Sequence, residues 1–237
     1  TPGVRALDLT PPEGERRAFP AGPRGLTVIG APVYAGRLPA DMAARFRAIP
    51  GGGGPAVVLV AYGNRAYEDA LLELRDLALA AGFTPIAAGA FIGEHSYSQA
   101  ATPIAPGRPD QADLREAEAF GRAVREKLAR LSALAGAAPI QVPGNFPYKE
   151  GSTVSGIAPV TDETLCNRCG ECAPLCPAGA ISGDDPAQVR ADLCIRCCAC
   201  VKFCHQGAKT LDHPKIGQFR DYLTTNHSAP KKPEMFL

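Results

Sequence analysis

The sequence LCNRCGECAPLCPAGAI, from Leu165 to Ile181, returns in altered form as LCIRCCACVKFCHQGAK, from Leu193 to Lys209. The two copies are offset by 28 residues, and each contains the cysteine pattern C-x2-C-x2-C-x3-C. Duplicated short loops of this kind are expected where one unit cannot enclose its own core and packs against a twin. The repeat therefore predicts a small domain in which the two copies lie against each other.

All nine cysteines lie between Cys166 and Cys204, so the residues before them contain no thiol. A secreted disulfide scaffold spreads its cysteines through a small core, and this chain has a large region without any. The observed run is the ligand pattern of bacterial ferredoxins, in which the fourth cysteine of each run binds the cluster of the other run. That rule assigns one [4Fe–4S] cluster to Cys166, Cys169, Cys172 and Cys204, and a second to Cys194, Cys197, Cys200 and Cys176.

The remaining cysteine, Cys198, aligns with Gly170 and not with a ligand. We expect it to be a small apolar side chain beside the cluster loop, as free cysteine often is, with an exchange of ligands as the alternative. His205 stands where the first copy has Pro177, and we expect a surface histidine there, with tuning of the cluster by a hydrogen bond as the alternative. Zinc is the competing metal, but structural zinc sites usually take two separated cysteine pairs.

Composition limits the classes of partner. The formal net charge of +1 does not provide the basic footprint of a general nucleic-acid binder. No apolar run approaches the ~18 residues of a membrane-spanning helix, and no signal-peptide pattern opens the chain. We therefore expect a cytoplasmic protein whose partners are redox proteins and not nucleic acids, without a membrane span.

Short apolar runs bounded by Gly and Pro precede the cysteines, as strands buried on both faces do: Gly25–Tyr34, Pro55–Gly63 and Thr84–Gly93. Helical patterns follow each run, over Ala40–Ile49, Tyr67–Gly82 and Gln111–Leu131. The alternation predicts an α/β domain with a parallel sheet. We expect an earlier run, Val4–Leu9, to join that sheet.

The two longer helical patterns carry apolar faces. In the Tyr67–Gly82 pattern the face consists of Leu71, Leu74, Leu77 and Ala78. In the Gln111–Leu131 pattern, for which Asp110 is the expected N-cap, it consists of Leu114, Ala117, Val124, Leu128 and Leu131.

Three loops leave the carboxyl ends of the expected strands, where ligands bind in open α/β sheets. They are Ala31–Pro39, Ala61–Asp69 and Ile92–Gln99, and each contains tyrosine. Tyrosines on flexible loops can form a stacking platform for a planar ring, or they can simply fill the loop edges.

The first region resembles a flavodoxin, and the order of domains resembles that of flavodoxin–ferredoxin fusion proteins. The motifs GAPVYAGRLP, VAYGNRAYEDALLEL, GRPD and VPGNFPYK carry this resemblance, together with the two cysteine runs. It implies a flavodoxin-like, doubly wound parallel sheet in residues 1–150, followed by a small α+β domain with two [4Fe–4S] clusters in residues 155–237. It also implies FMN, with a ring flanked by Pro32, Val33, Tyr34, Ala35, Gly36, Arg37, Tyr62, Gly63, Asn64 and Tyr67.

One feature of flavodoxins has no counterpart in the sequence. Flavodoxins begin with a strand and a Ser/Thr/Gly loop that cradles the FMN phosphate at a helix N-terminus, and nothing before Val4 matches it. The glycines of Gly51–Gly54 precede a strand, and Gly151–Gly156 follows no strand, so neither segment can replace it. Because the chain opens with Thr1, we expect that element to be missing, and FMN to bind this chain weakly or not at all while its full-length parent binds it.

These patterns predict electron transfer through two [4Fe–4S] clusters coupled to an FMN-type domain. A first alternative is a substrate-specific flavin-dependent reductase, for which Glu94, His95 and Tyr97 are the polar candidates. A second is a non-redox interaction module with structural metal. The sequence contains no recognisable catalytic triad, nicotinamide fingerprint or carboxylate pair.

Overall fold

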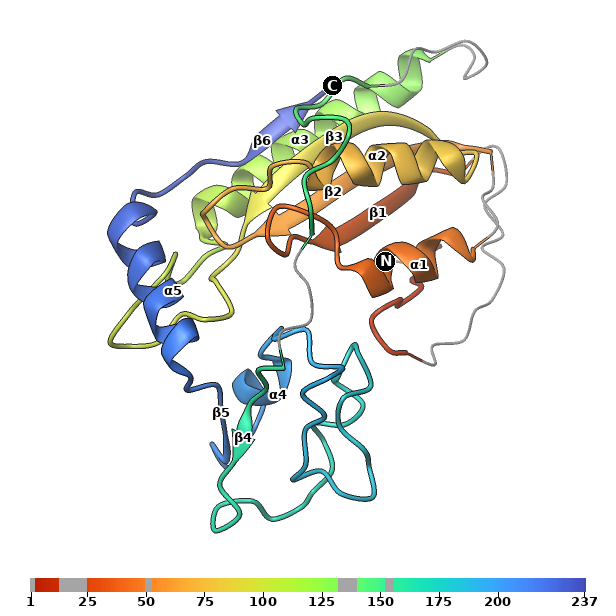
Figure 1. Ribbon diagram of the computed structural model, residues 1–237. Helices are drawn as coiled ribbons and strands as arrows, with labels where there is room; N and C mark the ends of the chain where they lie inside the picture. The colour runs from red at the N-terminus through yellow and green to blue at the C-terminus, as the bar shows by residue number, and fades with distance from the viewer. Residues whose placement is uncertain (1–2, 13–24, 50–52, 132–139, 152–155) are drawn as a thin grey trace. The chain divides into compact units, whose positions relative to one another are not determined.

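The chain forms two compact units in the computed structural model, which describes residues 3–12, 25–49, 53–131, 140–151 and 156–237 (Figure 1). The sheet unit comprises the described residues within 17–152 and 226–237, and the cysteine unit those within 1–16 and 153–225. Relative to the ranges expected from the sequence, 1–150 and 155–237, the two ends of the chain are exchanged. The N-terminal segment belongs with the cysteines and the C-terminal tail with the sheet.

The sheet unit is built on four strands in the order β1-β2-β3-β6. β1 (Thr27–Pro32), β2 (Pro55–Tyr62) and β3 (Thr84–Ile92) are parallel, and they confirm the three predicted strands. β6 (Glu234–Phe236) pairs antiparallel with β3 and was not predicted from the sequence. The sheet is therefore mostly, but not wholly, parallel.

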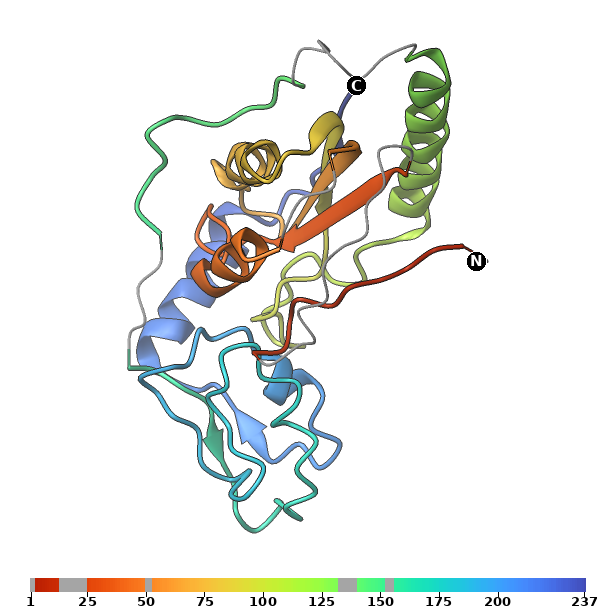
Figure 2. The ribbon, with the colours of Figure 1, turned by 90° about the vertical axis from the view of Figure 1, so that its right-hand side faces the viewer.

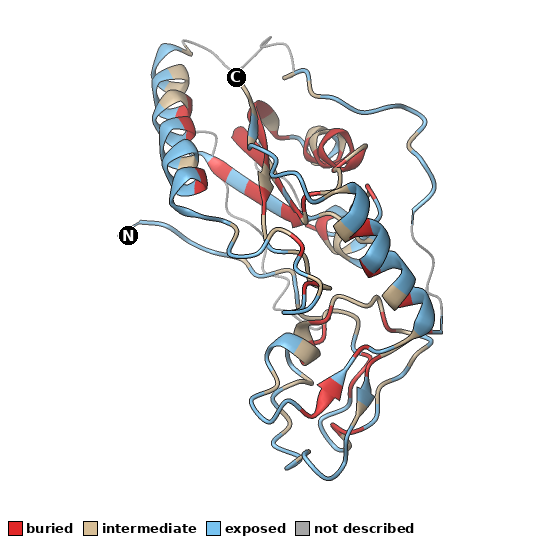
Figure 3. Ribbon diagram, turned by 90° about the vertical axis from the view of Figure 1, so that its left-hand side faces the viewer, coloured by how far each residue is buried: buried red, intermediate tan, exposed pale blue. Residues whose placement is uncertain are grey.

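Burial differs between the central and edge strands of this sheet. β2 and β3 are covered on both faces, and the alanines Ala87, Ala88 and Ala90 of β3 have no exposed surface. β1 instead alternates buried and exposed residues because it lies at the edge, and its Val28 is exposed. Figure 3 shows the buried residues gathered on the strands.

Helices cover both faces of the sheet (Figure 2). α1 (Ala40–Arg47) and α2 (Ala70–Ala80) lie on one face, and α3 (Gln111–Arg130) lies on the other. In α2 the predicted apolar face is buried in full: Leu71, Leu74, Leu77 and Ala78. Because β1, β2 and β3 are parallel, the loops that follow them all leave the sheet at the carboxyl ends of the strands.

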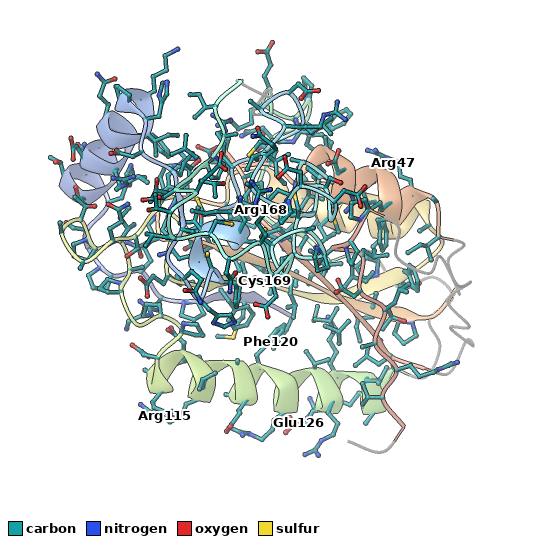
Figure 4. All side chains as sticks on the ribbon, turned by 90° about the horizontal axis from the view of Figure 1, so that it is seen from below. Arg47, Arg115, Phe120, Glu126, Arg168 and Cys169 are labelled. Atoms are coloured by element: carbon teal, nitrogen blue, oxygen red, sulfur yellow. The ribbon has the colours of Figure 1, made fainter. Side chains whose placement is uncertain are left out.

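The amphipathic pattern of α3 is narrower than predicted. Asp110 forms a capping box with Asp113, which confirms the expected N-cap. Phe120 points toward the sheet, with its ring 6.2 Å from that of Phe91, while Arg115 and Glu126 point away (Figure 4). Val124 packs with Phe120 against Val57 and Ala87 of the sheet. Leu114 was expected in the apolar stripe but is exposed. The buried stripe is centred on Phe120 and Val124, and Leu114 lies beside that stripe on the helix surface.

The segment Val4–Leu9 is not a strand of the sheet, contrary to expectation. It belongs to the cysteine unit, and only Leu7 and Leu9 are even half-buried. Arg5 and Asp8 interrupt the run, so it lacks the continuous apolar character of a strand buried in a parallel sheet.

The cysteine unit contains little regular structure. β4 (Val160–Thr161) and β5 (Lys209–Thr210) form a two-stranded antiparallel sheet, and α4 (Ala199–Lys202) and α5 (Pro214–Asn226) lie on either side of β5 in sequence. Its core is formed by buried residues of the two copies: Cys176, Ala180, Ile181, Cys194 and Cys200. Within the described part of the chain, no helix is long and apolar enough to cross a membrane.

Candidate functional site

The two cysteine copies share a backbone conformation as well as a sequence. Equivalent residues adopt the left-handed region in three pairs: Arg168 (φ 56°) with Arg196 (59°), Gly170 (80°) with Cys198 (61°), and Gly179 (61°) with Gly207 (62°). A left-handed conformation costs a non-glycine residue roughly 1–2 kcal/mol, so its recurrence at two arginines indicates a loop shape that both copies require. The sequence repeat is therefore a structural repeat.

The first set of predicted ligands surrounds one pocket. Cys166, Cys169 and Cys172 of the first copy and Cys204 of the second all line a cavity of about 190 Å³. Cys200 also reaches its wall. The fourth cysteine of the second copy thus lies with the triplet of the first.

The second set lies together around Cys176. Burial raises the pKa of Cys194, Cys197 and Cys200, that of Cys200 to about 12, and the nearby charge of a Cys176 thiolate raises each of them further. Cys176, Cys194 and Cys200 also pack together in one buried cluster. The fourth cysteine of the first copy thus lies among the triplet of the second.

Backbone N–H groups point at several of the sulfur atoms. The N–H of Ala180 donates to Cys176 Sγ at 3.2 Å, and that of Arg196 to Cys194 Sγ at 3.4 Å. The pKa of Cys204 is lowered: burial raises it, but hydrogen bonds from backbone N–H groups outweigh burial. These N–H groups belong to Ala208, Gln206, Lys209 and Gly207. Such N–H groups stabilise the thiolate form, which is the form that binds metal, and they tune cluster potentials.

The two sets differ in exposure. In the first set Cys169 is exposed and the other three are half-buried. In the second set only Cys197 is half-buried, and the other three are buried.

Across the described residues, no group of three or more His, Cys, Asp or Glu side chains lies close enough to hold a single metal ion.

Cys198 and His205 each lie beside one of the predicted ligand sets: His205 lines the pocket of the first set, and Cys198 neighbours Cys194 and Cys197 of the second. Cys198 is buried, its thiol donates to the Arg196 carbonyl at 3.7 Å, and burial raises its pKa to about 12. His205 is exposed, and its Nε2 lies 3.2 Å from a carboxylate oxygen of Glu171. Both positions fall outside the four cysteines of the C-x2-C-x2-C-x3-C pattern of their copy.

The predicted flavin residues of the second loop are largely inside the sheet unit. Tyr62 and Tyr67 are buried, with ring centroids 5.4 Å apart, and the Tyr67 hydroxyl donates to Glu234 at 2.9 Å. The Tyr62 hydroxyl is buried without a hydrogen-bond partner among the described residues, and burial, with Glu234 nearby, raises its pKa to about 12. These two rings therefore pack against each other and not outward.

Asn64 binds the C-terminal tail, which we define as residues 227–236. Its side-chain amide donates to the carbonyls of His227 at 2.6 Å and Ala229 at 3.0 Å, and its carbonyl accepts from the Lys231 N–H at 3.1 Å. Asn64 is 1% exposed and has φ 65°, a conformation that asparagine tolerates better than most residues. The loop and the tail are thus held together by one side chain.

Among the predicted flavin residues of the first loop, Arg37 forms an ion pair within the sheet unit. Arg37 donates to Glu73 at 2.8 and 2.9 Å, and its guanidinium lies 4.9 Å from the centre of the Tyr148 ring. A Cβ on Gly36 would overlap the Glu68 carboxylate, and one on Gly63 would overlap the His95 ring. The members that retain exposed surface, apart from Arg37 itself, are Pro32, Val33, Tyr34, Ala35 and Gly63.

The helix N-termini at this edge of the sheet carry carboxylates. Asp41 lies in the first turn of α1, Asp69 precedes α2, and Asp110 caps α3. A helix N-terminus favours an anion, but a carboxylate already placed there repels a phosphate. The described helix starts that follow β1, β2 and β3 are therefore unfavourable for a phosphate.

Sequence reasoning missed Lys209 as a residue of the cysteine site. It is 3% exposed and lines the pocket of the first set. The signal was available in the repeat, because Lys209 aligns with Ile181 and so places a cation where the first copy has an aliphatic side chain.

Comparison with known protein families supports the cysteine site. Residues 159–182 match the family of 4Fe-4S binding domains, Fer4. The match contains the first cysteine copy and ends before the second. Comparison with curated proteins and with solved structures finds no match. The chain therefore contains an iron–sulfur binding domain after an α/β domain with a mostly parallel sheet.

Proposed function

We propose that this protein is an electron carrier, or the electron-transferring component of an oxidoreductase, with two [4Fe–4S] clusters in its cysteine unit. The observation that carries the proposal is the exchange of fourth cysteines between the copies. Cys204 lies with Cys166, Cys169 and Cys172, and Cys176 lies with Cys194, Cys197 and Cys200. We infer that these are the two ligand sets, and that partner redox proteins in the cytoplasm supply and accept the electrons.

The residues present fit such clusters. Eight cysteines provide eight thiolates in two neighbouring groups, and backbone N–H groups are directed at sulfur atoms in both. When bound, a [4Fe–4S] cluster supplies one-electron chemistry. The protein holds the thiolates, shields the second set from water and leaves the first set accessible.

Metal content and two cysteine variants test this function. Anaerobically reconstituted protein is expected to contain about eight irons per chain. Cys176→Ser should damage the second cluster although it lies in the first copy, whereas Cys198→Ser, at a buried thiol of similar size, should keep both. Stoichiometric zinc with little iron, or loss of a cluster in Cys198→Ser alone, would contradict the proposal.

We further propose that the sheet unit has a flavodoxin-like ring site for FMN at Pro32–Ala35 and Gly63, the members of the predicted set that retain exposed surface besides Arg37. Tyr62, Gly36, Asn64 and Tyr67 would support that site from behind, and Arg37 would fix the first loop through Glu73. Because carboxylates occupy the helix N-termini, the phosphate would gain no charge-assisted bonds there. We therefore expect weak FMN binding by this chain.

Quenching of FMN fluorescence on titration with this chain measures the affinity. Riboflavin, which lacks the phosphate, is the matched ligand, and the two should bind with similar, low affinity. Binding of FMN that is tighter than that of riboflavin by orders of magnitude would show that residues of this chain hold the phosphate.

No observation favours a substrate-specific reductase. Glu94 accepts a hydrogen bond from the Gly107 N–H, and the His95 ring accepts one from the Tyr97 N–H and packs 5.1 Å from the Tyr97 ring. These contacts give the polar candidates a role in shaping their own loop.

A further inference from the structure

Lys209 places a buried ammonium in the cysteine unit. The residue is 3% exposed and pairs across the small sheet with Thr161, whose hydroxyl accepts a hydrogen bond from Lys209 Nζ at 2.7 Å. The Thr161 hydroxyl in turn donates to the Ala187 carbonyl at 2.6 Å. This chain of bonds fixes the position of the ammonium.

Among the described residues, no carboxylate pairs with the Lys209 ammonium. Its neighbours are the Thr161 hydroxyl and the thiols of Cys172 and Cys200. Burial of a charge is costly unless an opposite charge or a polar network compensates it. One neutral hydroxyl compensates it only in part. The opposite charge must therefore come from another source nearby.

The nearest source is the first ligand set. Lys209 lines the same pocket as Cys166, Cys169, Cys172 and Cys204. Burial raises the pKa of the Cys172 thiol, and the Lys209 charge acts against that rise, which places the ammonium beside this ligand. A cluster bound by four thiolates is negatively charged and would supply the missing partner.

The second site has no lysine at the equivalent position, and of its four predicted ligands the Lys209 charge lowers the pKa of Cys200. By the repeat, the residue equivalent to Lys209 is Ile181, which is buried in the core beside Cys176 and Cys194. The two sites share their ligand pattern and backbone conformation. They differ in buried charge, because the first has the Lys209 ammonium where the second has the aliphatic side chain of Ile181.

We propose that Lys209 raises the reduction potential of the cluster held by Cys166, Cys169, Cys172 and Cys204. The inference deepens the proposed function and rests on it. On reduction the cluster gains one electron, taken from a one-electron donor protein or, in a titration, from dithionite, and its negative charge grows by one. A fixed cation close by in a poorly solvated site stabilises that added charge and so favours the reduced state.

A redox titration followed by electron paramagnetic resonance tests the proposal on the reconstituted full chain. Lys209→Met removes the charge and retains most of the volume, so it should shift the midpoint potential of the first cluster to a lower value. The second cluster should shift less, because, among its ligands, the Lys209 charge acts on Cys200. Lys209→Arg keeps the charge and should shift it much less. The wave of the first cluster is assigned with Cys169→Ala, which removes a ligand of that site only.

Lys215→Met is the matched control, because Lys215 is an exposed lysine of the same unit whose charge is screened by solvent. Equal potentials in the wild-type protein and Lys209→Met, or a shift no larger than that of Lys215→Met, would overturn the role of Lys209 while two clusters remain in place. If Lys209→Met does not fold, Lys209→Gln gives the same comparison through a polar side chain that can still bond Thr161. A wild-type protein without clusters would instead refute the proposed function itself.

Discussion

Arg108 and Asp113 form an enclosed ion pair in the sheet unit, with side chains 11% and 5% exposed. The hydrogen bonds from Arg108 lower the pKa of Asp113 against the opposing effect of burial, and the Asp110 N–H lowers it further. Arg108 also donates to the Lys231 carbonyl of the tail at 3.0 Å. One pair thus joins the start of α3 to the C-terminal tail.

Asp113→Asn should destabilise the sheet unit by about 3 kcal/mol at pH 7, because it removes charge-assisted hydrogen bonds worth about 1.5–3 kcal/mol each and leaves the guanidinium only the Asp110 carboxylate, at 3.7 Å. A carboxyl whose pKa is lowered on folding contributes stability above its unfolded pKa of about 3.9 and loses it as the pH falls through the folded value. The gap between wild type and variant should therefore close in the acid range below about pH 3.9. Urea unfolding at a series of pH values measures it, and a gap that is independent of pH would refute the electrostatic account.

The cysteine sets show what single residues reveal in advance. Spacing alone predicts that Cys204 and Cys176 change partners between the copies, and Cys204 lines the pocket of the first triplet. That Cys198 is not a ligand stays a prediction of the same spacing. The left-handed backbone at Arg168 and Arg196 could not be predicted, because arginine does not favour that region and only the loop around the sulfur atoms imposes it. Local composition indicates a ligand, whereas the backbone strain around it comes from packing.

At the scale of elements, periodicity predicted three strands and three helices to within a few residues, because each is long enough to show a pattern. β6 could not be predicted in this way, since it contains only three residues and its partner, β3, lies far away in sequence. The edge position of β1 was equally hidden. Pairing with remote segments, and not local preference, decides both features.

Asn64→Gly tests how the tail is attached to the sheet unit. Glycine adopts φ 65° without strain, so the variant isolates the loss of the amide. It removes three hydrogen bonds from a buried site, and each is worth about 0.5–1.5 kcal/mol, so a destabilisation of about 2–3 kcal/mol is expected. Hydrogen exchange should show faster exchange along 227–236. Unchanged protection there would mean that β6 and the bond from Arg108 to the Lys231 carbonyl hold the tail without Asn64.

For the whole molecule, the sequence correctly separated an α/β region from a cysteine region, because composition changes sharply between them. It did not show that each end of the chain belongs with the more distant unit. Such an exchange depends on contacts of the terminal segments, among them the Pro12 ring, which lies 3.5 Å from where a Cβ of Gly179 would be, and the Asn64 bonds to the tail. Neither contact has a signature in local sequence.

The division into two units leads to a prediction for metal removal. A ligand that binds only the folded state stabilises the part of the molecule that holds it, and metal binding is coupled to folding where the ligands form much of the core. In the cysteine unit the buried cluster that joins the two copies has three cysteines among its five residues, whereas the sheet unit has an apolar core without cysteine, including Val57, Ala87, Phe120 and Val124. Loss of iron should therefore unfold the cysteine unit and leave the helical signal of the sheet unit largely intact.

Thermal unfolding before and after chelation, followed by visible absorbance and circular dichroism, should give one transition that moves to lower temperature and one that stays. A single transition that shifts as a whole on iron loss would show instead that the exchanged ends make the two units fold as one.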